Sequence, residues 1–163
     1  MTNKRNLHLV EGAMIAALYV VLTYICNFFG LANGVIQVRL SEALTILPFF
    51  TPAAIPGLTI GCLLSNILTG CPLPDIIFGT LATLLGAFGS YYLRNFKYLV
   101  ALPPILANII IVPIVLQKAY GITDSLPFLM ATVGAGEVIS AGILGTILLL
   151  ALIPYRNVIF KKY

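Results

Sequence analysis

The sequence is poor in charge, because only 9% of its 163 residues are Asp, Glu, Lys or Arg. A soluble domain averages about 25% charged and about 45–50% apolar residues, whereas 60% of this chain is hydrophobic and its mean hydropathy is +1.06. So few charges cannot cover the surface of a water-soluble protein. Their scarcity excludes a soluble enzyme, a nucleic-acid binder and a disordered regulator, and it predicts an integral membrane protein with no nucleic-acid partner.

Residues that hold metals or carry out covalent catalysis are also scarce. The chain has one histidine, His8, and three cysteines, which form no C-x-x-C pair. This pattern argues against a zinc site, a disulfide framework and a Ser–His or Cys–His nucleophile. The chain also lacks a glycine-rich phosphate loop with its lysine. We therefore expect no enzymatic activity, no metal and no cofactor, so any active transport must draw its energy from a partner or an ion gradient.

The uncharged stretches predict six membrane helices in a single domain that covers residues 1–163. A spanning helix needs about 20 mostly apolar residues, and the charged residues divide most of the chain into pieces of this size. The stretch 43–74 is longer, and Pro48, Pro52 and Pro56 divide it into two short helices. The predicted helices cover residues 8–29, 42–54, 56–70, 75–93, 98–117 and 126–154.

The cations predict that both termini lie in the cytoplasm. With six helices, seven cations fall on the side of the termini, and only Arg39 and Lys118 fall on the other side. Cytoplasmic segments of membrane proteins carry such an excess of Lys and Arg. The cations on the inner side are Lys4, Arg5, Arg94, Lys97, Arg156, Lys161 and Lys162.

Glu137 is the acid that lies deepest within a predicted span. It follows Pro127 by ten residues, which is roughly 15 Å along a helix, and Ser140 lies on the same helix face. A charge in hydrocarbon costs at least about 2.5–3.5 kcal/mol, so such residues are functional candidates. Glu137 either contacts a ligand, serves an ion or proton relay, or pairs with a cation, although no Lys or Arg is predicted at that depth.

Five further polar residues near or within spans are candidates for a binding site. Arg39 and Glu42 share one side of the second helix, where they either anchor the helix end as an ion pair or close over a ligand. Asp75 either caps the fourth helix or offers a second carboxylate. Asn66 and Asn108 carry buried amides that either hydrogen-bond to a neighbouring helix or contact a ligand beside Glu137.

Small residues form two stripes that predict close helix packing. In the fourth helix, Gly79, Thr83, Gly86 and Ser90 recur at helical spacing and predict internal packing. In the first helix, Ala13 and Ala17 form an A-x-x-x-A pair near the cytoplasmic end. This pair either packs within the molecule or forms an interface with a partner subunit.

Six short spans, an A-x-x-x-A pair and the lack of an ATP site resemble the substrate-binding S component of an energy-coupling factor (ECF) transporter. More narrowly, three segments look like the QueT family of queuosine-precursor transporters, and the similarity runs from about Leu7 to Pro154. These segments are Val38-Arg-Leu-Ser-Glu-Ala-Leu44, Phe78-Gly-Thr-Leu-Ala-Thr-Leu-Leu-Gly86 and Leu102-Pro-Pro-Ile-Leu-Ala-Asn108.

The resemblance implies a cargo, partners and a location. The cargo is a 7-deazaguanine such as preQ1 or queuine, and the partners are a transmembrane coupling subunit, EcfT, and two cytoplasmic ECF ATPases. The location is the plasma membrane of a prokaryote, where the S component topples to carry its cargo inward. Ala13 and Ala17 then lie against the coupling subunit. The alternatives are an S component for another vitamin or purine-like cargo, and a small ion-coupled secondary transporter.

The chemistry of a deazaguanine suits the candidate residues. Its N1–H and exocyclic amine are adjacent donors that one carboxylate, Glu137, can accept together. Asn66 or Asn108 can donate to the carbonyl, and an aromatic face can sandwich the ring. A cationic aminomethyl arm favours a second carboxylate, Glu42 or Asp75. The predicted substrate site comprises Glu137, Asn66, Asn108, Glu42, Arg39, Asp75 and Ser140, with Phe78, Tyr120 or Phe128 as the aromatic face.

Overall fold

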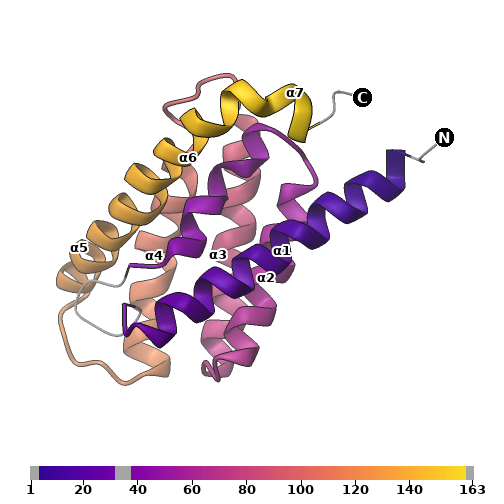
Figure 1. Ribbon diagram of the computed structural model, residues 1–163. Helices are drawn as coiled ribbons and strands as arrows, with labels where there is room; N and C mark the ends of the chain where they lie inside the picture. The colour runs from indigo at the N-terminus through magenta and orange to yellow at the C-terminus, as the bar shows by residue number, and fades with distance from the viewer. Residues whose placement is uncertain (1–3, 32–37, 161–163) are drawn as a thin grey trace.

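The computed structural model describes residues 4–31 and 38–160, and the regular structure of these residues is entirely helical (Figure 1). Lys161 and Lys162 lie outside the described residues. The elements are α1 (Lys4–Phe28), the 3-10 helix η1 (Leu40–Phe49), α2 (Ala54–Leu68), α3 (Leu73–Tyr92), α4 (Leu102–Ala119), α5 (Leu126–Glu137), the π-helix η2 (Val138–Leu144), α6 (Gly145–Leu152), the short 3-10 helix η3 (Ile153–Tyr155) and α7 (Arg156–Ile159).

Four helical segments of the described chain are long and apolar enough to cross a membrane. They are Asn6–Phe28, Leu73–Tyr92, Leu102–Ala119 and Leu126–Ile159. Between the first two lie the shorter apolar helices η1 and α2, with 10 and 15 residues. Their shortness fits the three prolines, since Pro48 lies inside η1 and the chain turns at Pro52 before α2 begins. The all-helical class is therefore confirmed for the described residues, with four candidate membrane spans, and the predicted count of six membrane helices is not confirmed.

Helices α1 and α2 approach closely because small residues face each other between them. A Cβ atom added to Gly57 would lie 2.7 Å from the carbonyl oxygen of Gly12, which is closer than van der Waals contact allows. Ala16, one turn further along α1, is also buried. The main hydrophobic core continues from this contact through Ile46 of η1 and Leu58 of α2. The close approach thus brings η1 and α2 together under α1.

Helices α3 and α4 pack against each other through the last two residues of the predicted small-residue stripe, Gly86 and Ser90. A Cβ atom on Gly86 would lie 2.7 Å from the Cα atom of Pro104, and the Ser90 hydroxyl donates a 2.7 Å hydrogen bond to a backbone carbonyl in the α3–α4 connection. The prediction of internal packing is confirmed for these two residues. Gly79 and Thr83 line a cavity instead, so the stripe changes its role along the helix.

The last long segment combines α5, η2 and α6 into one continuous rod, as the predicted helix at 126–154 requires. Its π-helical part begins immediately after Glu137. There the Oγ atom of Ser140 accepts a hydrogen bond from the backbone N–H of Arg39 at 3.1 Å. The segment that leads into η1 is thereby fastened to the rod.

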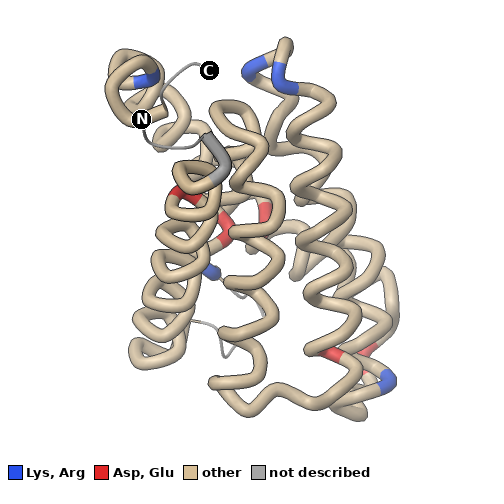
Figure 2. The backbone as a smooth tube through the Cα atoms, turned by 90° about the vertical axis from the view of Figure 1, so that its right-hand side faces the viewer, with Lys and Arg blue, Asp and Glu red and all other residues tan. Residues whose placement is uncertain are grey.

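The ends of the chain and the charges define two ends of the bundle. Figure 1 shows both termini at one end, together with the η1–α2 and α3–α4 connections, while the α2–α3 and α4–α5 connections lie at the other. We call these the terminal end and the far end. Figure 2 shows charged residues at both ends, with a smaller group that is mainly acidic half-way along. Three acids that line the candidate site, Glu42, Asp75 and Glu137, are buried within the bundle.

Candidate functional site

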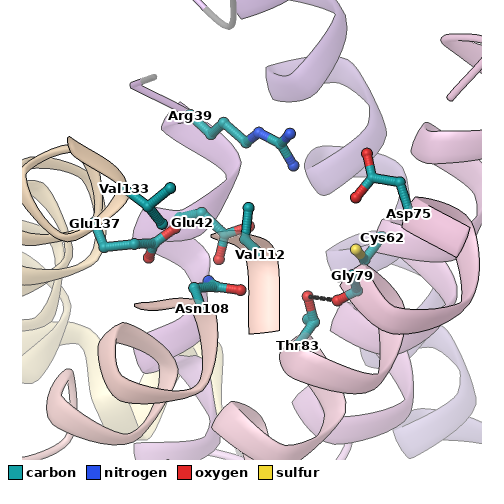
Figure 3. Close-up of a pocket in the computed structure, with 10 residues that line it drawn as sticks. All are labelled: Arg39, Glu42, Cys62, Asp75, Gly79, Thr83, Asn108, Val112, Val133 and Glu137. Carbon is teal, nitrogen blue, oxygen red and sulfur yellow. Dashed lines mark hydrogen bonds between the residues drawn. The ribbon is translucent and has the colours of Figure 1, made fainter. Parts of the chain in front are cut away.

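Two adjoining cavities lie in the far half of the bundle. The inner cavity has a free volume of about 30 Å³, enough for about two water molecules, and the outer cavity has about 320 Å³, at the lower end of the range for small-molecule pockets. Arg39, Asp75 and Val112 line both. The inner cavity is lined by Arg39, Glu42, Cys62, Asp75, Gly79, Thr83, Asn108, Val112, Val133 and Glu137 (Figure 3).

Glu42 and Glu137, which lie far apart in the sequence, meet at the inner cavity. Glu42 is 3% exposed and Glu137 is 9% exposed. In each, the buried Oε2 atom has no hydrogen-bond partner among the described residues. A buried polar atom without a partner costs free energy, so such atoms are expected to meet donors from a ligand or water. The two acids therefore offer acceptor positions at the closed end of the site.

Each of these acids also has a neighbour that orients it. The phenol of Tyr19 donates a 2.5 Å hydrogen bond to Oε1 of Glu42. The Asn108 side chain lies beside the carboxyl group of Glu137 (Figure 3). Since these neighbours hold one side of each carboxyl group, the other side faces the cavity. The prediction that Asn108 accompanies Glu137 agrees with this placement.

Arg39 and Asp75 face each other across the boundary between the two cavities (Figure 3). Within the described chain, the guanidinium of Arg39 forms no ion pair within 4.0 Å, so the predicted alternative of an Arg39–Glu42 pair is not formed. Asp75 lies in the first turn of α3, as the helix-dipole interpretation requires, but it makes no capping hydrogen bond and instead lines the site. Arg39 is thus a cation near three acids that forms no direct ion pair with any residue described by the structure.

Tyr120 closes one side of the outer cavity by bonding to Asp75. Its phenol donates a 2.7 Å hydrogen bond to Oδ2 of Asp75, and it follows directly after α4. Partial burial, this hydrogen bond and the nearby carboxylate raise the pKa of the Tyr120 phenol, so the phenol remains a donor. Of the three predicted aromatic residues, Tyr120 is the one that the structure brings to the site.

Phe78 and Phe128 lie on the outer surface and line neither cavity. They are 48% and 46% exposed. On α3, the residues that face the cavities are Asp75, Gly79 and Thr83, which share one helix face because they are spaced by four residues. Phe78 lies off that face. The predicted ring contact therefore has no support from Phe78 or Phe128 in this arrangement.

Asn66 and Ser140 do not line the inner cavity with Glu137. Asn66 is buried and lines the outer cavity, where its amide donates a 3.6 Å contact to the sulfur of Cys62. Ser140 is buried behind the site and accepts from the backbone of Arg39. Ser140 thus positions the segment that carries Arg39 and Glu42, and it lines neither the inner nor the outer cavity.

Several residues at the site were not expected from the sequence. Tyr19 was not singled out, although a phenol within a span requires a hydrogen-bond partner, and this need is the signal that could have found it. Gly79 and Thr83 were assigned to packing because small residues serve both roles. Thr23 and Asn27 of α1 line the outer cavity, and their only signal is polarity near the end of a span.

Ala13 and Ala17 are exposed on α1 and line neither the inner nor the outer cavity. Gly12 and Ala16, next to them in the sequence, are buried against α2. The small residues of α1 therefore lie on two faces of the helix: Gly12 and Ala16 pack against α2, whereas Ala13 and Ala17 do not. The pair remains available on the outside of the bundle.

Comparison with known proteins connects this arrangement to a transport family. The family model of the QueT transporter matches residues 9–154. Over 85 residues, the chain is 39% identical to the queuosine precursor transporter QueT of Lactococcus lactis subsp. cremoris (strain MG1363). The alignment covers 52% of this chain and 50% of that relative, so the chain spans about half the length of the curated relative it matches. No solved structure matches the chain.

Proposed function

The chain belongs to the QueT transporter family, and from this premise we propose that it is the substrate-binding S component of an ECF-type importer for a queuosine precursor. As a member of a transporter family with four candidate spans, it is a multi-pass membrane protein and not an enzyme. The proposed cargo is a 7-deazaguanine such as preQ1 or queuine. The proposal rests on two carboxylate oxygens, of Glu42 and Glu137, that have no hydrogen-bond partner within the described residues and lie beyond an outer cavity of about 320 Å³.

The hydrogen-bonding edge of a deazaguanine matches the inner cavity. Its N1–H and exocyclic amine donate in parallel, and Glu137 accepts both in a paired, charge-assisted arrangement. Asn108, beside Glu137, donates to the adjacent carbonyl of the base. The inner cavity is too small for the whole ring, so the ring occupies the outer cavity and directs this edge inward past Arg39 and Asp75.

The balance of charge favours a cargo that carries a cation. The inner cavity is lined by Glu42, Asp75 and Glu137 on the acidic side and by Arg39 on the basic side. The aminomethyl arm of preQ1 is cationic and finds Asp75 at the boundary of the two cavities. A carboxylate and an ammonium group attract each other more strongly in such a buried site than they would at the protein surface. This balance supports preQ1 ahead of neutral bases.

The position of the cavities supports the orientation and the partners that we propose. The outer cavity is lined by residues of the α2–α3 connection, such as Gly70 and Pro72, so it lies toward the far end, opposite the termini (Figure 1). With both termini in the cytoplasm and η1 and α2 as two short spans beside four longer ones, cargo enters from outside the cell membrane. EcfT and two ECF ATPases then supply the coupling and the energy, with Ala13 and Ala17 facing EcfT.

A ligand titration of the purified chain tests the proposal. In detergent, thermal stability is followed while preQ1, queuine, guanine, thiamine and riboflavin are added in turn. A ligand at 100 times its dissociation constant stabilises the folded state by about 2.7 kcal/mol, and we expect this from preQ1 or queuine. A clear response to thiamine or riboflavin with none to any deazapurine would overturn the proposed cargo.

A further inference from the structure

Two further hollows adjoin each other at the terminal end, away from the substrate site. The terminal cavity has a volume of about 400 Å³ and is lined mainly by polar and aromatic residues, among them Glu11, Phe49, Phe50, Tyr91, Arg94 and Arg156. The lateral groove has about 280 Å³ and is lined mainly by aliphatic residues, among them Met14, Ile15, Leu18, Leu47, Leu148 and Leu152. Glu11 and Phe160 line both. A polar hollow therefore continues into an apolar one.

Two arginines give the terminal cavity its charge. The guanidinium of Arg94 lies 4.0 Å from the ring centre of Tyr91, and that of Arg156 lies 5.6 Å from the ring centre of Phe49. In the part of the chain that the structure describes, neither arginine forms an ion pair with an acid within 4.0 Å. The rings restrain the guanidinium planes, and the N–H groups donate to no acid among residues 4–31 and 38–160. Such groups bind phosphate oxygens in pairs.

The acid in this cavity does not neutralise these arginines. Glu11 is turned toward other partners, since its Oε2 atom accepts a 2.8 Å hydrogen bond from the Thr51 hydroxyl and lies 3.8 Å from Nδ1 of His8. Its carboxylate is only partly exposed, at 13%. The cavity therefore retains an excess of positive charge.

The lateral groove lies where lipid tails would meet the protein. Met14 and Leu18 are 62% and 50% exposed, and both belong to a candidate membrane span. The adjoining terminal cavity lies at the end of the bundle that also carries the α3–α4 connection (Figure 1). An apolar groove along a span, with a cationic cavity at its end, is complementary to an anionic amphiphile whose chain runs along the membrane normal.

We propose that these two hollows together bind an anionic phospholipid, with its phosphate on Arg94 and Arg156 and one acyl chain in the lateral groove. A soluble phosphate compound would satisfy the arginines and leave the groove empty. An apolar helix of another subunit would cover the groove and leave the guanidinium groups without an anion. A phospholipid satisfies both hollows at once, because its charge and its chain are joined at the junction formed by Glu11 and Phe160.

Native mass spectrometry of the full chain in detergent tests this site. The probes are phosphatidylglycerol and phosphatidylcholine with identical acyl chains, and sn-glycerol 3-phosphate as the soluble anion. We expect preferential retention of phosphatidylglycerol. Each of Arg94→Gln and Arg156→Gln should weaken it by roughly fivefold, the usual effect of one basic residue near an anionic membrane surface. Lys97→Gln removes the same charge from the same end but outside the cavity, and it should leave retention unchanged.

The groove is tested by Met14→Trp, which places a large ring at an exposed position in it. This variant should weaken the retention of both lipids while leaving the preference for phosphatidylglycerol. Equal retention of the two lipids, an equal effect of Lys97→Gln, or binding of sn-glycerol 3-phosphate as tight as that of the lipid would overturn the proposal. Unchanged lipid retention in Met14→Trp, with loss of copurification of a coupling subunit, would assign the groove to that subunit and also overturn it. Thermal unfolding of each variant confirms that it folds.

Discussion

We call the substrate site in the far half of the bundle the acidic end and the terminal cavity the basic end; the two differ in the sign of their charges and in how deeply these charges are buried. At the inner cavity, Glu42 and Glu137 are almost fully buried, and each has an oxygen that meets no hydrogen-bond partner in the described part of the chain. At the terminal cavity, Arg94 and Arg156 are exposed and rest on aromatic rings. A buried charge needs donors at defined positions, whereas an exposed one is already solvated. The acidic end is therefore suited to select one small molecule, and the basic end to attract a class of anions.

The largest expected effect is a loss of uptake, caused by a substitution on the exposed face of α1 at a residue that lines neither the acidic nor the basic end. Ala17→Trp, or Ala13→Trp, should abolish uptake by the complete transporter and leave ligand binding unchanged, because the indole keeps the coupling subunit from approaching α1. Uptake into cells and thermal titration of the isolated chain measure the two properties. Leu85→Trp, at an exposed position of α3, is the matched control and should retain uptake. Full uptake by Ala17→Trp, or uptake by the chain alone in energised liposomes, would contradict the proposed coupling.

The second-largest expected effect is a loss of ligand affinity when the buried Glu137 carboxylate is replaced by an amide. Glu137→Gln should weaken deazaguanine binding by roughly 10–150-fold, because hydrogen bonds to a charged group contribute about 1.5–3 kcal/mol. Isothermal titration measures the dissociation constant. Glu11→Gln makes the same substitution at the terminal end and should leave the affinity unchanged. Unchanged affinity in Glu137→Gln would remove this residue from the site.

A smaller and more selective effect is expected at the boundary of the two cavities. Asp75→Asn should reduce affinity for preQ1 about tenfold more than affinity for guanine, because guanine lacks the cationic arm; tenfold corresponds to ~1.4 kcal/mol. Paired titrations of the two ligands give this ratio directly. Equal losses for both ligands would place the aminomethyl group elsewhere.

The smallest expected effect concerns the contact that closes the outer cavity. Tyr120→Phe removes the hydrogen bond to Asp75 and should lower the free energy of unfolding by about 0.5–1.5 kcal/mol. Denaturation of the ligand-free protein in detergent measures the change. Tyr155→Phe is the control, since the exposed Tyr155 hydroxyl forms no hydrogen bond with the described residues. A loss of equal size in the control would show that the contact with Asp75 contributes nothing.

The acidic end could be predicted from the sequence because charge is rare in it. Arg39, Glu42, Asp75 and Glu137 stand out against apolar surroundings, and the structure brings all four to the inner cavity. A charged side chain within a span faces the interior of the bundle rather than lipid, and the interior of a small bundle offers few positions where several such side chains can lie apart. The short second and third helices followed from their prolines in the same way.

The aromatic contacts could not be predicted in this way. A phenylalanine is equally stable against lipid and against a ligand, so the sequence contains no signal for the face on which Phe78 or Phe128 lies. Their orientation depends on the packing of α3 and α5 against their neighbours. Gly134 and Gly136 leave room for local unwinding beside Glu137, but no proline interrupts residues 128–153, so the sequence did not predict the π-helical segment that follows Glu137. Tyr19 was missed because tyrosine is common at membrane interfaces.

The π-helical turn after Glu137 makes the last rod a helix of two independently oriented parts. A π-bulge accommodates one residue more than a regular α-helix would over the same path, and each residue of an α-helix adds about 100° of rotation. If the same residues of Val138–Leu144 formed a regular α-helix, every later side chain would therefore turn by about that angle while Glu137 stayed in place. Leu149, now almost fully buried in the core, would then leave it, so the extra residue lets the acid face the cavity while the rest of the rod keeps its contact with η1.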